Sequence, residues 1–146
     1  MAIRVLAAAI AGGITFFILG FLIFGLALEN MVMKPNMNSF PGLMNEVPLW
    51  APLVIANIVS GLLLAYIFDQ WAGFRTFAEG AKGGAIVWFL ISLSFQLMFL
   101  AFMNLHKNYI PVIADIAAST IMGAIGGGVV AQVLGIMNKQ ETPADA

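Results

Sequence analysis

The chain has 146 residues, of which 62% are hydrophobic and 9% are charged, and it contains no cysteine. Average soluble domains carry about 25% charged residues, so a water-soluble fold of this length cannot bury this much apolar surface, and lipid must be its solvent. The net charge of −1 gives no reason to expect a nucleic-acid partner, and the lack of cysteine excludes disulfides and thiolate metal sites.

Four apolar runs predict an all-α polytopic membrane protein with one transmembrane domain over residues 1–146. Each run exceeds the roughly 20 residues that cross a bilayer as a helix, and continuous apolar runs of this length are not typical of membrane strands. The first run is too long for the apolar region of a signal peptide, which favours an anchored helix. The expected helices span residues of about 3–28, 48–68, 80–103 and 110–137.

The positive charges predict the orientation of these helices. Cytoplasmic loops of membrane proteins carry an excess of Lys and Arg, and the side that holds both termini has four such residues against two on the other side. We therefore expect a multi-pass protein of the bacterial inner (plasma) membrane with both termini in the cytoplasm. The polar tail, residues 138–146, is expected to be disordered. The four residues are Arg4, Arg75, Lys82 and Lys139, and the two are Lys34 and Lys107.

Two tryptophans flank the second apolar run. Trp50 and Trp71 are 21 residues apart, which corresponds to about 31 Å of helix. Tryptophan is enriched at membrane interfaces, and the hydrocarbon layer is roughly 30 Å thick. The spacing predicts that the two indoles lie at opposite faces of the bilayer.

The fourth run carries an acid followed by a row of small residues. Asp115 lies inside the apolar run, and steps of four residues from it meet only small side chains. Residues four apart lie on one inclined row of a helix, and rows of small residues allow two membrane helices to approach closely. The row predicts a helix-packing contact, either within the chain or between copies. Its members are Ser119, Gly123, Gly127, Ala131 and Gly135.

An internal similarity links the second and fourth runs. The segment VIANIVSGLLLAYI, residues 54–67, aligns with VIADIAASTIMGAI, residues 112–125, with five of fourteen positions identical. Asn57 aligns with Asp115, and the small residues Gly61 and Ala65 align with Ser119 and Gly123. Two tandem two-helix repeats in an antiparallel bundle would explain this pattern, and chance similarity between apolar sequences is the alternative. In such a bundle Asn57 and Asp115 would lie at matching depth and could face each other.

Asp115 and Asn57 form the candidate polar site within the membrane. A charged group in a span costs up to about 2.5–3.5 kcal/mol at mid-membrane, so Asp115 is expected to face protein or water. The functional interpretation is a proton or cation site of a small ion- or proton-coupled solute transporter or channel. The structural interpretation is a hydrogen bond to a neighbouring helix or a pair with His106 or Lys107.

The loop after the first run contains four methionines, Met31, Met33, Met37 and Met44. Thioethers are soft ligands that suit Cu(I), which makes copper binding a minor alternative. Methionine is equally an adaptable apolar residue, and neither His nor Cys joins the cluster in the sequence. We therefore expect no metal and no other cofactor.

No set of residues indicates catalysis. The chain has one His and seven acids, and no serine–histidine–acid set or pair of carboxylates stands out, so an enzyme is not expected. The leading expectation is a structural or accessory subunit in the lipid bilayer. Such a subunit would form a homo-oligomer or join another membrane protein.

Several segments resemble a broad bacterial family of four-helix membrane proteins of unknown function. These are FFILGFLIFG in the first run, GLLLAYI in the second, the polar loop after the third, and MGAI followed by glycine in the fourth. The resemblance covers most of the chain and implies a four-helix membrane fold. It implies no activity.

Overall fold

The computed structural model describes residues 2–141, and these residues form helices joined by short loops. The first helix is continuous and consists of α1 (Ala2–Gly20), the π-helical η1 (Phe21–Met33) and α2 (Lys34–Asn36). The second consists of α3 (Trp50–Ile67) and η2 (Phe68–Ala72). The helices α4 (Phe77–Phe102) and α5 (Ile110–Glu141) complete the fold, and all four helices are long and apolar enough to cross a membrane. The predicted all-α, four-helix architecture is confirmed.

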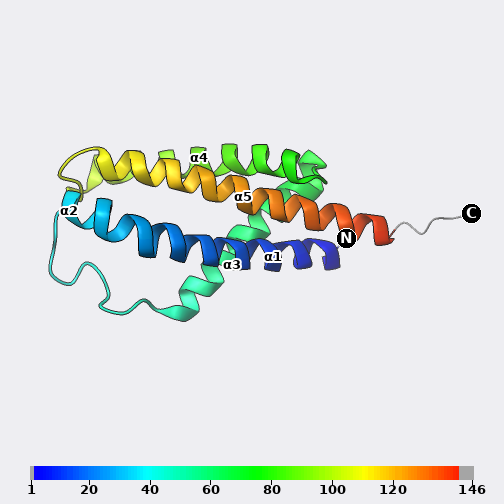
Figure 1. Cartoon of the computed structure of the whole chain (residues 1–146), viewed down its shortest axis with the longest axis horizontal. Helices are drawn as coiled ribbons and strands as arrows, with labels where there is room; N and C mark the ends of the chain where they lie inside the picture. Colours follow the sequence, from blue (N-terminus) through cyan, green and yellow to red (C-terminus); the bar gives the residue numbers. More distant parts are fainter. Residues whose placement is uncertain (1, 142–146) are drawn as a thin grey trace, which may run out of the picture.

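The helices are arranged as two packed pairs. α4 lies along α5, and α1 packs against both α5 and α3, as Figure 1 shows. α1, α4 and α5 run side by side, whereas α3 crosses α1 obliquely. We call the end of the bundle that holds the start of α1 the terminal end, and the end with the loops of residues 37–49 and 103–109 the loop end.

The buried core lies in the half of the bundle near the terminal end. The ring of Phe16 stacks on Trp88 at a centroid distance of 4.7 Å and an interplanar angle of 10°, which joins α1 to α4. No residue of η1 is buried, so α3 completes a four-helix core only along the part of α1 near the terminal end. The buried cluster consists of Ala8, Ala9, Phe16, Leu64, Ala65, Phe68, Met122, Val130, Ala131 and Leu134.

Glycines bring the backbones of α4 and α5 into contact. A Cβ atom added to Gly80 would overlap the backbone oxygen of Gly127, and one added to Gly84 would overlap that of Gly123. Lipid offers no hydrophobic drive between helices, so close backbone packing supplies the attraction that holds them together. The row of small residues on α5 therefore packs against α4 within the same chain.

The pair α1 and α3 crosses at a second glycine contact. A Cβ atom on Gly61 would overlap the backbone oxygen of Ala9 and lie 2.6 Å from the backbone nitrogen of Gly13. The first and third runs also share a glycine pair 71 residues apart, so that Gly13 corresponds to Gly84. Gly84, however, meets Gly123, which aligns with Ala65 rather than with Gly61. Both helix pairs therefore pack through close backbone contact at glycines, but their registers differ by one helical turn.

Three helices end later than the hydrophobic pattern predicts. The second was expected to end near residue 68 and continues through η2 to Ala72. The first was expected to end near residue 28, but it continues to Asn36 because polar side chains bond along the helix: Lys34 pairs with Glu29 and Asn30, and Asn36 donates to the backbone oxygen of Val32. Helix α5 runs to Glu141, so residues 138–141 of the tail expected to be disordered are helical. The rest of that tail, residues 142–146, lies outside the described residues.

The two tryptophans of the second span do not mark the two ends of the bundle. Trp71 lies at the terminal end, where its ring meets Tyr66 edge-on at 5.6 Å. Trp50 lies 6.5 Å from Phe17, which is 13 residues, or about 20 Å of helix, beyond Arg4. Because α3 crosses α1 obliquely, its 18 residues do not reach the loop end.

The glycine contact between α4 and α5 predicts a large effect of a single methyl group. Gly123→Ala should destabilise the protein by about 1–3 kcal/mol, because the new Cβ would overlap the oxygen of Gly84 and the Cβ of Trp88. The matched control is Gly25→Ala, whose Cβ would lie 3.5 Å from its nearest neighbour, Phe21. Unfolding in mixed micelles with increasing SDS measures both. Equal stability of the two variants would contradict the contact.

Candidate functional site

Asp115 projects from α5 towards α4, where Gln96 is its polar partner. The side chain of Gln96 interacts with the Asp115 carboxyl group, and His106 acts on that group electrostatically. Gln96 is buried, with an exposed fraction of 8%. Gln96 lies four residues beyond the buried Ser92 on α4, so both polar residues continue the row that Gly80 and Gly84 begin.

Two buried polar atoms near Asp115 have no partner. They are Oε1 of Gln96 and Nδ1 of His106, and within residues 2–141 neither makes a hydrogen bond. A buried polar atom without a hydrogen bond costs about 1–3 kcal/mol, so such atoms are uncommon in folded proteins. The α4–α5 contact therefore ends, towards the loop end, in a polar cluster of Gln96, His106 and Asp115.

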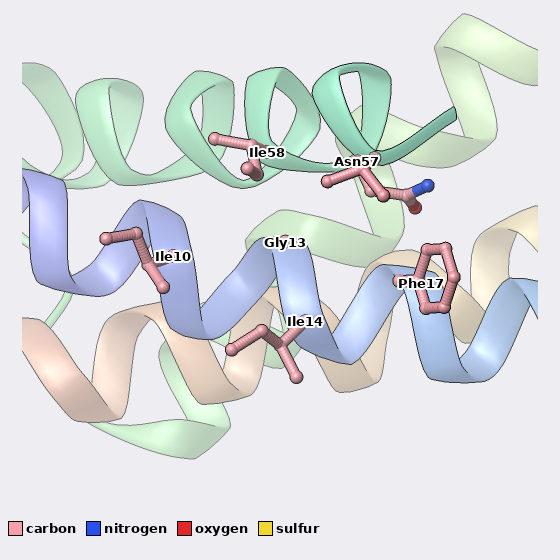
Figure 2. Close-up of a pocket in the computed structure, with 7 residues that line it drawn as sticks. Ile10, Gly13, Ile14, Phe17, Asn57 and Ile58 are labelled. Atoms are coloured by element: carbon pink, nitrogen blue, oxygen red, sulfur yellow. The ribbon is translucent and has the colours of Figure 1, made fainter. Parts of the chain in front are cut away.

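Asn57 lies in a different place, in an open groove between α1 and α3. Figure 2 shows this groove, a cavity of about 210 Å³ whose walls are apolar, with the amide group of Asn57 at its edge. The amide nitrogen of Asn57 donates a hydrogen bond of 2.8 Å to the backbone oxygen of Leu53, one turn earlier on α3. The residues that line the groove are Ile10, Gly13, Ile14, Phe17, Val54, Asn57 and Ile58.

The structure does not bring Asn57 and Asp115 together. Asn57 faces α1, whereas Asp115 meets Gln96 of α4, so the two polar residues belong to different helix pairs. The expectation that they could face each other fails because α3 crosses α1 instead of standing opposite α5. Two residues at the same depth in a helix bundle need not face the same neighbouring helix.

The remaining predicted packing residues are distributed along two helix contacts. Ala131 lies beside Gly80, and Gly135 lies where a Cβ would overlap the backbone oxygen of Arg75. Ser119 is half-buried on the same helix. On α3, Gly61 and Ala65 are both buried, with Gly61 at the crossing with α1.

The four methionines of the copper hypothesis separate into two groups. Met31 and Met44 are 79% and 81% exposed, whereas Met33 and Met37 are half-buried at the end of the first helix. Among residues 2–141, no group of three or more His, Asp or Glu side chains could hold a metal ion.

A buried ion network at the terminal end was not foreseen from the sequence. The carboxylate of Asp69 has no exposed surface and accepts hydrogen bonds from Nε of Arg4 at 3.0 Å and from Nη2 of Arg75 at 2.8 Å. Arg4 also donates to Oδ1 of Asn138, and Gln70 donates to the second oxygen of Asp69. The signal in the sequence was the presence of one acid and two arginines on the same predicted side.

This network joins all the elements at the terminal end. Arg4 is on α1, Asp69 on η2 and Asn138 on α5, while Arg75 precedes α4 and also donates to the backbone oxygens of Phe68 and Phe74. Helix α4 then begins with a reciprocal cap between Thr76 and Glu79. Because every group is held by groups of the same chain, the network serves the fold.

No family model, curated protein or solved structure matches this chain.

The network predicts that loss of the Asp69 charge is costly. Asp69→Asn should destabilise the protein by more than about 2 kcal/mol, yet by less than the roughly 3–5 kcal/mol of a fully buried pair, because both arginines keep some contact with solvent. Glu29→Gln, which breaks the exposed pair with Lys34, should cost less than about 1 kcal/mol. Unfolding in mixed micelles tests both, and similar losses would contradict the assignment.

Proposed function

We propose that this chain is a structural subunit that self-associates in the membrane through the face formed by α1 and α3. The observation that carries this proposal is Asn57, a polar side chain at the edge of an apolar groove. It lies 12 residues before Asp69, or about 18 Å along the helix from the terminal end. A polar group at this depth is stabilised by a partner from another helix.

The hydrogen-bonding capacity of Asn57 is only partly used. One N–H of its amide donates to Leu53, and within residues 2–141 its other N–H and its Oδ1 have no hydrogen-bond partner. A carboxamide has both a donor and an acceptor, so two copies of Asn57 are complementary to each other across a twofold axis. This self-complementarity favours a second copy of the chain as the occupant of the groove.

The shape of the face supports the same proposal. Most of the apolar side chains of α3 are exposed, and the groove beside this helix is open. One copy therefore offers both a ridge and a recess. Gly13 forms part of the recess, because a side chain there would meet Ile58. An isologous pair of such faces packs the ridge of each copy into the recess of the other.

The cavities support a structural role over ion or solute transport. The groove between α1 and α3 and a more open one on the outer surface of α4 and α5 have almost entirely apolar walls, and Asp115 lines neither. Asp115 meets Gln96 at a helix contact, which is the arrangement of a packing residue. We also infer that the chain is not an enzyme.

We propose the bacterial inner membrane as its location, with both termini in the cytoplasm. The support is the gathering of positive charge: Arg4 and Arg75 lie at the terminal end, with Lys139 one residue beyond the networked Asn138. The positive-inside rule places that end in the cytoplasm.

The self-association proposal predicts a specific effect at Asn57. Asn57→Leu should weaken dimerisation by about threefold to thirtyfold, since a hydrogen bond between membrane helices contributes about 0.6–2 kcal/mol. Förster transfer between labelled copies in liposomes, measured over a range of protein-to-lipid ratios, gives the dissociation constant. The matched control is Leu97→Ala on α4, where the exposed side chain lies outside the groove and dimerisation should be unchanged. A monomeric wild type, or undiminished dimerisation of Asn57→Leu, would contradict the proposal.

The orientation is testable because the chain has no cysteine. In intact spheroplasts, a membrane-impermeant maleimide should label Ser39→Cys, which lies in the loop after α2, and should leave Lys139→Cys unlabelled. Lysis should expose Lys139→Cys. The reverse pattern would place both termini outside.

A further inference from the structure

His106 lies beside the methionines at the end of the first helix, although 69 residues separate it from Met37 in the sequence. The two residues form an antiparallel bridge between the segment after α2 and the loop that joins α4 to α5. The backbone bonds run from Asn38 to Leu105 at 2.8 Å and from Lys107 to Asn36 at 2.9 Å, on either side of the pair.

This bonding pattern fixes the relation between the two side chains. Bonds that flank a pair, instead of joining its own members, define the non-hydrogen-bonded type, in which the Cα atoms are about 4.5 Å apart and both side chains lie on one face. The imidazole of His106 and the thioether of Met37 are therefore neighbours. Both residues are half-buried.

A second thioether is placed on the same face. The chain is helical from Met33 through Asn36 and turns to an extended conformation at Met37. Residues four apart on a helix lie one turn apart on one face, so Met33 lies directly before Met37. Three soft or borderline ligand groups thus gather at the loop end.

The surrounding contacts hold this arrangement in place. Lys107 donates from Nζ to the backbone oxygen of Pro35, and Asn108 donates to Oδ1 of Asn36. Asn38 donates to the backbone oxygen of Asn104. With the two backbone bonds, these contacts fasten the end of the first helix to the loop and reduce the reorganisation that ligand binding would require.

We propose that His106, Met37 and Met33 form a Cu(I)-binding site. Nδ1 of His106 is buried and has no hydrogen-bond partner within residues 2–141, so in the tautomer protonated at Nε2 its lone pair is available to a metal. Thioethers are soft ligands that suit Cu(I), and imidazole is a good ligand for copper. The three ligands are neutral, and the Asp115 side chain lies close enough to His106 to interact with it electrostatically.

The sequence pattern and the structure point to different ligands. The loop methionines suggested a set that includes Met31 and Met44, whereas the bridge pairs Met37 with His106 and helical spacing adds Met33. Met31 and Met44 are exposed and lie outside the bridge, so they provide matched controls within the same segment.

The test is competition for Cu(I) between a coloured chelator and the full-length protein in detergent with ascorbate present. We expect one Cu(I) per chain and a loss of affinity of about tenfold or more in Met37→Leu and in His106→Gln. Met31→Leu and Met44→Leu should bind as the wild type does. Leucine has nearly the volume of methionine, so Met37→Leu should keep the fold, which circular dichroism checks.

Failure of the wild type to withdraw Cu(I) from the chelator would overturn the proposal. Equal losses of affinity in Met31→Leu and Met37→Leu would also overturn it. X-ray absorption of the copper-loaded wild type provides an independent measurement that needs no variant: sulfur and nitrogen scatterers are expected, and a shell of oxygen and nitrogen alone would contradict the site.

Discussion

The fold depends on a single carboxylate that is buried between two arginines. Asp69 has no exposed surface, and the charges of Arg4 and Arg75 balance and exceed its own. Charged groups near a membrane are tolerated when protein groups pair with them, so these three residues must meet. Their meeting, together with the bond from Arg4 to Asn138, fixes the start of α1, the end of α3, the approach to α4 and the end of α5 at one place.

Given this common end, glycines determine how the helices lie against one another. Gly80 and Gly84 bring α4 onto Gly123 and Gly127 of α5, and Gly61 brings α3 onto α1. At the loop end, the bridge between Met37 and His106 fastens the first helix to the α4–α5 loop. α3 alone stops short of that end, and the face it shares with α1 is left open with Asn57 in it.

Composition and the length of the apolar runs were enough to predict four membrane helices, and steps of four residues identified the small face of α5. Other features depend on residues far apart in the chain. Arg4 and Asp69 are 65 residues apart, and each resembles an ordinary interfacial charge when considered alone. The tilt of α3 arises from the crossing at Gly61, which separates Asn57 from Asp115. The pairing of His106 with Met37 likewise joins two loops whose sequences contain no shared pattern.

Disulfide formation in native membranes tests the proposed self-association through the α1–α3 face directly. Because the wild type has no cysteine, single cysteines report only contacts between copies. Val54→Cys, in the groove, should form a disulfide-linked dimer on mild oxidation, whereas Leu97→Cys on α4 should form no disulfide between copies. A monomeric Val54→Cys, or equal dimer formation by both variants, would contradict the account.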